Sequence, residues 1–299
     1  MTKPSAAKLF SAIDIITLVY SAWVLLYMSL GISRVRDAEV QIPIYLSIVA
    51  AILLLAWWHK KLDALRYPRL HAALKLVRSL YPVLLFGHFF TSGYSFNRII
   101  FADWLDPFFM NIDHSIWGYL PSLEWGLRYN HWIISELFHF AYFCYYPMIV
   151  GLPLYLYLKN PKGFAELFFN LCFSFYLCYF IFSLIPVIGG RYIPEAMELT
   201  QVYRAGPFTH IMVFIYRHSH HLGGAFPSSH VAIAIVLTIG ALRHVRRLGY
   251  LFVVISFFLA LATVYCHYHW FIDAVFGVFT GIGAYYLANF THRKLQGAL

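Results

Sequence analysis

A histidine and an aspartate near the C-terminal end of the chain have a spacing that suits nucleophilic catalysis. His269 and Asp273 are four residues apart in HYHWFID (267–273), so on a helix they would lie one turn apart on the same face. The carboxylate could then accept the Nδ1 hydrogen of the imidazole and leave Nε2 free as a nucleophile or base. A structural His–Asp pair at a helix end would have the same spacing. His267 is a second candidate nucleophile, but its six-residue separation from Asp273 points it to a different helix face.

A second cluster, GGAFPSSH (223–230), combines a helix start with a histidine. Ser228 or Ser229 can cap the helix, and the free N–H groups of a first helical turn favour a bound phosphate. Gly224 permits close approach of the backbone to such a ligand, and His230 would project from the same turn. An ordinary capped membrane span would show the same Pro-Ser-Ser pattern.

The third cluster, GGRYIP (189–194), supplies a permanent positive charge. The guanidinium of Arg191 is planar and suited to bidentate contact with phosphate, although an interfacial arginine can also extend its side chain to the membrane surface. Together, the three clusters offer an anion-binding group, two imidazoles and an orienting acid. Phosphoryl transfer requires these parts, namely positioning, charge stabilisation, a nucleophile and an acid for the leaving group.

The elements that must position these clusters are membrane spans. Hydrophobic residues make up 61% of the 299 residues and charged residues only 12%, whereas soluble domains are nearer half apolar and a quarter charged. A span needs about 20 apolar residues, which predicts an all-α, polytopic helical membrane protein with about eight transmembrane helices. These lie near 9–32, 41–59, 81–100, 133–158, 164–188, 227–243, 248–266 and 269–290.

Counting spans places the three clusters on one face. His230 opens the sixth stretch and His269 opens the eighth, so two crossings return the chain to the face that it left. The loops of the opposite face hold most of the Lys and Arg residues, which is typical of cytoplasmic loops. We therefore expect both termini in the cytoplasm and the site on the periplasmic or lumenal side. The compact chain favours a bacterial inner membrane over a Golgi membrane.

Two further segments are not predicted to span the membrane. Residues 60–80 are basic and amphipathic, and we expect them to lie along the cytoplasmic surface. Residues 101–132 mix tryptophan, phenylalanine and acidic residues, which suits the outer interface. This second segment could cap a site, but a plain interfacial anchor is the favoured interpretation.

These clusters resemble motifs of a known enzyme family. GGAFPSSH and the His269-x3-Asp273 pattern resemble the second and third motifs of the type 2 phosphatidic acid phosphatase and haloperoxidase superfamily. The branch that contains fungal inositol phosphorylceramide synthase is the most similar, because residues 139–157 and the DPFFMNIDHSIWG region also resemble it. The likeness covers roughly residues 80–290. It implies two N-terminal transmembrane helices and a basic segment in residues 1–80, and a six-helix lipid phosphatase or phosphotransferase core in residues 81–299.

The resemblance also implies a metal-independent mechanism. His269 would attack phosphorus and form a phosphohistidine, Asp273 would orient it, and His230 would protonate the leaving oxygen. The phosphate would be held by a group of four residues: Arg191, Ser228, Ser229 and Gly224. The acceptor in the second step would be water for a phosphatase or an alcohol for a transferase.

The sequence departs from the superfamily pattern at four positions. The first motif usually has Lys and Pro around its arginine, but Leu184 and Tyr192 stand there. The third usually has Ser-Arg ahead of its histidine, but Ala262 and Thr263 stand there. Two phosphate-binding cations are therefore missing, and the losses resemble the phosphotransferase branch more than simple phosphatases. Candidate replacements are Arg217, Arg204 and Arg98.

The expected function is that of a membrane enzyme acting on lipid phosphates, either as a phosphatase or as a phospho-head-group transferase. The expected partners are a lipid-phosphate substrate and membrane lipids, with no nucleic acid and no cofactor. The alternative is a multi-span lipid transporter or flippase, but transporters tend to place polar groups at mid-membrane, and here they gather at one face. Three histidines that could bind zinc precede the glycines, at His218, His220 and His221. They lack a thiolate or carboxylate partner at metal spacing, so we expect no metal.

Overall fold

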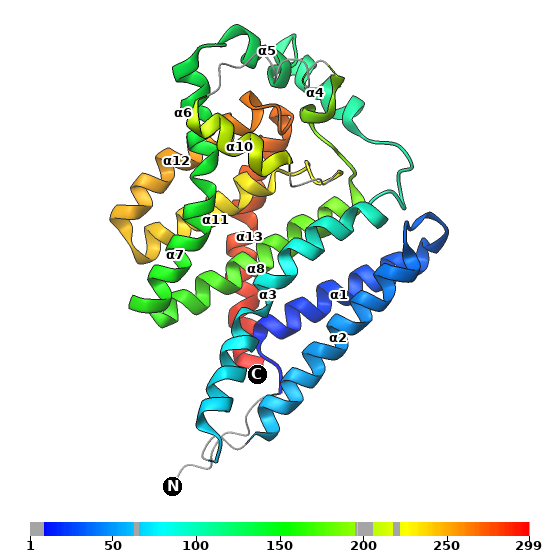
Figure 1. Cartoon of the computed structure of the whole chain (residues 1–299), viewed down its shortest axis with the longest axis vertical. Helices are drawn as coiled ribbons and strands as arrows, with labels where there is room; N and C mark the ends of the chain where they lie inside the picture. Colours follow the sequence, from blue (N-terminus) through cyan, green and yellow to red (C-terminus); the bar gives the residue numbers. More distant parts are fainter. Residues whose placement is uncertain (1–8, 63–65, 195, 197–205, 218–221, 299) are drawn as a thin grey trace.

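The computed structural model describes residues 9–62, 66–194, 196, 206–217 and 222–298, and every regular element within them is a helix (Figure 1). The N-terminal part contains α1 (Ala12–Leu30), α2 (Ala38–Lys61) and α3 (Pro68–Phe96). The short helices α4 (Asp106–Trp117) and α5 (Pro121–Arg128) follow. The remaining elements are α6 (Trp132–Phe143), α7 (Tyr145–Lys159), α8 (Pro161–Leu184), α10 (Pro207–Arg217), α11 (Ser229–His244), α12 (Arg246–Tyr265) and α13 (Phe271–Ala298).

The expected all-α polytopic fold is confirmed. Among the described residues, seven helical segments are long and apolar enough to cross a membrane, with α6 and α7 together forming one of them. The sixth expected span, 227–243, is not among these seven; it forms α11, which has 16 residues. Its length of about 24 Å is less than the roughly 30 Å of a hydrocarbon core. Because α11 packs against α8, α12 and α13, it is surrounded by protein more than by lipid.

The boundary of the third span differs from the expectation. It was expected at 81–100, after a surface segment at 60–80, but α3 already begins at Pro68 and continues to Phe96. Proline is well tolerated at the first position of a helix, and no strong helix breaker follows it before Pro82. The basic segment therefore forms the end of α2 and the first turns of α3.

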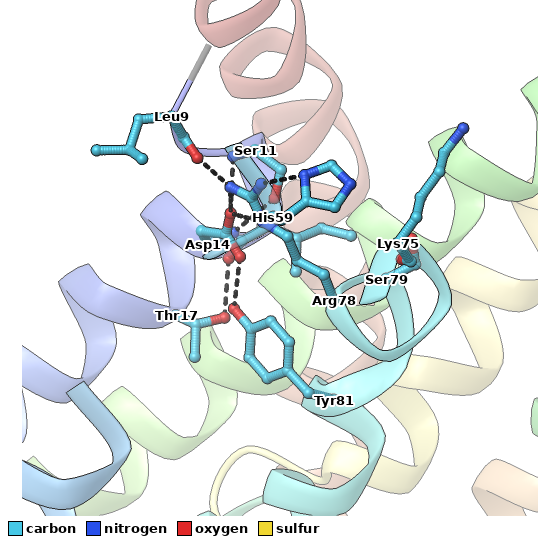
Figure 2. Close-up of polar contacts among 10 residues, drawn as sticks. Leu9, Ser11, Asp14, Thr17, His59, Lys75, Arg78, Ser79 and Tyr81 are labelled. Carbon is cyan, nitrogen blue, oxygen red and sulfur yellow. Dashed lines mark hydrogen bonds and ion pairs between the residues drawn. The ribbon is translucent and has the colours of Figure 1, made fainter. Parts of the chain in front are cut away.

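A buried ion pair near the start of α1 explains why this part of α3 does not lie free on the membrane surface. The Arg78 guanidinium donates from Nε to Asp14 Oδ2 at 2.9 Å, and it also contacts His59 Nδ1 at 3.2 Å. Tyr81 donates to the other Asp14 oxygen at 3.2 Å, and Asp14 is 1% exposed. Figure 2 shows these groups converging from α1, α2 and α3. A buried charge is costly unless it is paired and hydrogen-bonded, so this cluster fixes the three N-terminal helices to one another.

The fourth expected span, 133–158, is divided in two. The helix stops at Phe143 and resumes at Tyr145, with Cys144 between α6 and α7. Pro147 has no N–H, and its ring would clash with the carbonyl of the residue four positions earlier, which is Phe143. The proline therefore accounts for the break, which falls beside the predicted site.

Helix α8 is the centre of the bundle, and α3 lies alongside it (Figure 1). It packs against α1, α3, α7, α11 and α13, and 72% of the residues in its most apolar stretch are buried. At one end of the bundle, drawn at the top of Figure 1, α4 and α5 cover the ends of the long helices, with α4 against α13 and α5 against α12. Residues 101–132 therefore pack on the protein itself.

Candidate active site

The structure places most of the predicted site residues around one small cavity. The cavity has a volume of about 150 Å³ and lies between the loops that precede α11 and α13 and the helices α3, α6, α7 and α10. Five of the seven predicted residues line it: Arg191, Gly224, Ser229, His230 and His269. The other lining side chains are mainly aromatic, and tyrosines at 142, 146, 192, 216 and 268 are among them. Asp273 and Ser228 lie behind this lining.

His269 and Asp273 approach each other as their spacing predicts. The Nδ1 atom of His269 lies 3.6 Å from Oδ2 of Asp273, a distance that is longer than a hydrogen bond. His269 is 5% exposed and Asp273 is fully buried. Among the described residues, His269 Nδ1 and Asp273 Oδ1 have no hydrogen-bond partner. Because catalytic hydrogen bonds are often long without substrate, a small movement would join these two buried groups.

Asp273 also stabilises the start of its own helix. Its Oδ2 atom accepts the backbone N–H of Trp270 at 2.9 Å, and its backbone carbonyl accepts the N–H of Ser228 at 3.0 Å. The second bond ties the beginning of α13 to the beginning of α11. The structural interpretation of the His–Asp pair and the catalytic one are therefore compatible, because one carboxylate faces both the helix end and the imidazole.

Burial favours the neutral form of the His269 imidazole. It lowers the pKa of His269 to about 3, and the nearby His230 lowers it further, against a small opposing effect of a hydrogen bond with the Ala225 backbone. A buried imidazole loses hydration when it is charged, which explains the direction of this pKa shift. At neutral pH the ring is thus unprotonated and carries a lone pair, which a nucleophile requires.

His230 lies in the first turn of α11 and faces His269 across the cavity. The ring centroids of the two histidines are 6.4 Å apart in an edge-to-face arrangement, so both rings lie together at the wall of the cavity. The His230 ring packs against Tyr142 at 5.0 Å and Tyr145 at 4.7 Å. These aromatic contacts fix the ring from the side of α6 and α7.

The two serines have different positions. Ser228 is fully buried, and its hydroxyl accepts the Val231 N–H at 3.5 Å as the N-cap of α11. It does not line the cavity, whereas Ser229 does. The structure therefore places Ser228 as a helix cap and Ser229 where a ligand could reach its backbone and hydroxyl.

Arg191 is held in place before any ligand binds. One guanidinium nitrogen donates to the Tyr216 carbonyl at 2.9 Å, and the guanidinium carbon lies 4.2 Å from the centre of the Tyr216 ring. The preceding Gly189 has a positive φ of 82°, and a Cβ there would lie 2.5 Å from the Tyr268 carbonyl oxygen. Only glycine fits this turn, which brings the arginine loop against the histidine loop.

Two buried acids of α4 hold the loops of the site. Asp106 accepts the N–H groups of Ile188 and Gly189 at 3.0 and 2.9 Å, and it also accepts the indole N–H of Trp270 at 2.9 Å. One carboxylate thus joins the segment before Arg191 to the segment after His269. Burial raises the pKa of Asp106, while these three hydrogen bonds oppose the shift.

Asp113 lies seven residues further along α4 and caps the beginning of α13. It accepts the N–H groups of Phe271 and Ile272 at 2.7 and 3.0 Å, which are first-turn donors of α13. With Asp273 on the Trp270 N–H, the beginning of α13 is occupied by carboxylates. An anion in the cavity would therefore meet the positive end of α11 and not that of α13.

The acids of α4 were not predicted as site residues. Residues 101–132 were expected at the outer interface, as an anchor more than as a cap, whereas the structure shows that Asp106 and Asp113 bind the motif loops and so support the site. Their i, i+7 spacing on a helix was a signal that two acids share one face. The backbone N–H groups that these two carboxylates bind could be identified only from the three-dimensional structure.

Glu136 of α6 has a similar role for α10. It accepts the backbone N–H groups of Gly206, Phe208 and Thr209 at 3.1, 2.9 and 3.0 Å. It therefore caps the helix that carries Tyr216, whose carbonyl holds Arg191. Glu136 was not predicted as a site residue either.

The remaining candidates lie away from the cavity or outside the described residues. Arg98 stacks on Trp104 at 4.9 Å and does not line the cavity. His267 is fully buried, and its Nδ1 atom forms a hydrogen bond with the Ser122 carbonyl oxygen. Its ring does not line the cavity. Arg204, the Arg217 side chain and the three histidines 218, 220 and 221 lie outside the described residues. Within the described part of the cavity lining, Arg191 is the one cation, and no described cluster of three or more His, Cys, Asp or Glu residues could hold a metal.

Comparison with known proteins identifies the family. No curated protein and no solved structure matches the chain. The PAP2 superfamily, however, matches residues 109–287, a region that extends from α4 to α13 and includes the whole cavity except Phe90 of α3. This region is more than half of the chain. The protein is therefore a multi-pass membrane member of the PAP2 superfamily, a family of phosphatases and phosphotransferases of lipid phosphates.

Proposed function

We propose that this protein transfers a phosphate-bearing group from a lipid through a covalent phosphohistidine at His269, without a metal ion. The observation that carries the proposal is the arrangement of Arg191, His230 and His269 around one cavity, with Asp273 buried 3.6 Å behind the nucleophile. Family membership supports lipid phosphates as the class of substrate. The acceptor is water or a lipid alcohol, as in the inositol phosphorylceramide synthase branch that the sequence resembles.

In the first step, Nε2 of His269 attacks phosphorus, and the bond from phosphorus to the leaving oxygen breaks. His230 donates its proton to that oxygen, since a bound phosphate anion stabilises the protonated imidazole beside it. Asp273 accepts a hydrogen bond from Nδ1 and stabilises the positive charge that develops on the His269 ring.

In the second step, water or an alcohol attacks the phosphohistidine. His230 accepts the proton of the attacking hydroxyl, the nitrogen–phosphorus bond breaks, and neutral His269 returns. Throughout both steps, Arg191 and the first-turn N–H groups of Ser229 and His230 stabilise the phosphate oxygens. The aromatic walls keep water scarce, which strengthens these charge interactions.

We place this site on the non-cytoplasmic side, with both termini in the cytoplasm. The basic residues on the opposite loops support this orientation. A bacterial inner membrane is the proposed location. Cysteine accessibility from the two sides of sealed vesicles, at a cysteine introduced for His114 on the exposed surface of α4, tests the orientation directly.

Product analysis with purified protein in detergent tests the function. The substrates are labelled phosphatidic acid, undecaprenyl pyrophosphate, and an inositol phospholipid with ceramide. The variant is His269→Ala, and the matched control is His114→Ala, which removes an exposed histidine of α4.

The proposal expects a labelled product that is lost in His269→Ala and retained in the control. Free phosphate identifies a phosphatase, and a labelled head group on a new lipid identifies a transferase. Turnover that survives His269→Ala contradicts the mechanism. Movement of lipid across sealed vesicles without any turnover favours the transporter alternative instead.

A further inference from the structure

A long apolar groove lies on the membrane-facing side of the core, below the candidate active site. It has a volume of about 480 Å³ and runs between α3 and α7, with α8 as its floor. The floor includes Phe168, Leu171 and Phe175, which are 3–7% exposed. The walls include Val83 of α3 and Val150 of α7, which are 51% and 64% exposed. The groove is thus deep but open sideways toward the lipid.

The groove and the active-site cavity are neighbours along two helix faces. On α3, Phe86 lines the groove and Phe90, one turn further, lines the cavity. On α7, Val150 lines the groove and Tyr146, one turn earlier, lines the cavity. Residues four apart lie on the same helix face, so on each of these two helices one face lines both the groove and the cavity.

The length of the groove suits a hydrocarbon chain. From Phe86 to Leu76, the wall formed by α3 spans about 15 Å at 1.5 Å per residue, which matches the roughly 15 Å of one leaflet of the hydrocarbon core. At the far end, Tyr157 and Phe164 pack edge to face with centroids 5.3 Å apart. Except for this tyrosine, the lining is formed by hydrocarbon side chains and a proline.

We infer that this groove binds one hydrocarbon chain of the lipid whose phosphate occupies the cavity. The inference rests on the proposed function and extends it, because it assigns the chain-binding site and the path of entry. The tail enters sideways from the membrane between α3 and α7, and the phosphate then lies between Arg191 and the two histidines. A lipid with one long straight chain fits the length of the groove, whereas a short-chain lipid leaves most of it empty.

The expected energetic effect is one of positioning. A tail in the bilayer or in a micelle is already in an apolar medium, so entering the groove adds little hydrophobic free energy. Its contribution is to hold the phosphorus at a fixed place and orientation relative to His269. Small displacements of reacting groups can reduce rates by about 100-fold.

The test uses bulky substitutions that fill the groove without disturbing the core. Val83→Trp and Val150→Trp place an indole at two exposed positions on opposite walls. Their matched controls are Leu84→Trp on α3 and Leu158→Trp on α7, which are 82% and 67% exposed and do not line the groove. Activity is measured on dipalmitoyl and dioctanoyl phosphatidic acid in mixed micelles. A second readout is cross-linking to phosphatidic acid that carries a diazirine on one acyl chain.

The inference expects the groove variants to lower kcat/KM for the dipalmitoyl lipid by about ten-fold or more, because a displaced tail misplaces the phosphorus. The dioctanoyl lipid is affected less, and the controls resemble the wild type. The diazirine labels peptides of α3 and α7 in the wild type and not in Val83→Trp. Groove variants that match their controls in both readouts overturn the inference and leave the proposed function intact. Absence of turnover together with groove labelling contradicts the proposed function and supports the groove.

Discussion

Asp106 offers the sharpest test of how the site is held together. Its carboxylate accepts three N–H groups, two at Oδ1 from Gly189 and Trp270 and one at Oδ2 from Ile188. In Asp106→Asn, the best rotamer keeps the two bonds at Oδ1 and turns the new NH₂ group toward the Ile188 N–H. Two donors then face each other in a site that is 5% exposed.

The size of the effect follows from that geometry. One unpaired buried donor costs about 1–3 kcal/mol, and about 2 kcal/mol corresponds to a roughly 30-fold change at 1.36 kcal/mol per factor of ten. We therefore expect kcat/KM to fall about 30-fold in Asp106→Asn, because the unpaired donor displaces the loops that carry Arg191 and His269. Asp106→Ala loses all three bonds and should fall further.

The assay is steady-state turnover of whichever lipid phosphate the purified protein uses best. Asp103→Asn is the matched control, because Asp103 is exposed and lies three residues before Asp106 in the segment that leads into α4. If Asp106→Asn and Asp103→Asn have the same kcat/KM, the carboxylate does not position the site, and the structural argument for α4 is wrong.

Three further predictions concern the arginine, the helix packing and the buried imidazole. Arg191→Lys keeps the charge but loses the planar fork, so KM should rise by about ten-fold, and further in Arg191→Ala; an unchanged KM in both variants would remove Arg191 from substrate binding. In Gly281→Ala the new methyl would lie 2.5 Å from the Ala232 carbonyl oxygen of α11, whereas Gly283 has open space around it. Thermal unfolding in detergent should therefore show that the free energy of unfolding falls by about 1–3 kcal/mol in Gly281→Ala and is unchanged in Gly283→Ala. The pKa of His269 is about 3 in the folded protein and near 6.5 in the unfolded chain. The buried neutral imidazole therefore contributes its full share of stability above pH 6.5. This contribution is lost as the pH falls toward 3, by at most about 1.4 kcal/mol per pH unit. His269→Gln should therefore show a shallower acid loss of stability than the wild type, and equal slopes would contradict the buried neutral imidazole.

The sequence was sufficient for the membrane class and for the gathering of the motifs on one face. Long apolar stretches have strong length and composition signals, so the spans could be found one by one. Because two apolar stretches separate His230 from His269, counting them predicted that both histidines lie at the same end of the bundle. The helix boundaries at Pro68 and Cys144 were harder, because proline is tolerated at a first turn and disruptive in an interior.

The supporting shell of the site could not be read from the chain in the same way. Asp106, Asp113 and Glu136 act on backbone N–H groups that are far away in sequence, and such contacts leave no local pattern. Ser228 illustrates the opposite problem, because a serine before a helix has the same pattern whether it caps the helix or binds a ligand. The cations expected from the family at Leu184 and Thr263 have no replacement among the described lining residues, where the first-motif arginine, Arg191, is the one cation.

Rapid quenching during turnover shows whether His269 forms a covalent bond to phosphorus. The purified protein is mixed with a lipid labelled in its phosphate, quenched during turnover under conditions that preserve phosphohistidine, and digested for mass spectrometry. We expect the label at His269, on the peptide that leads into α13, and we expect it to be lost in His269→Ala. Label on His230 or His267, or product formation with no labelled peptide at any quench time, would contradict it.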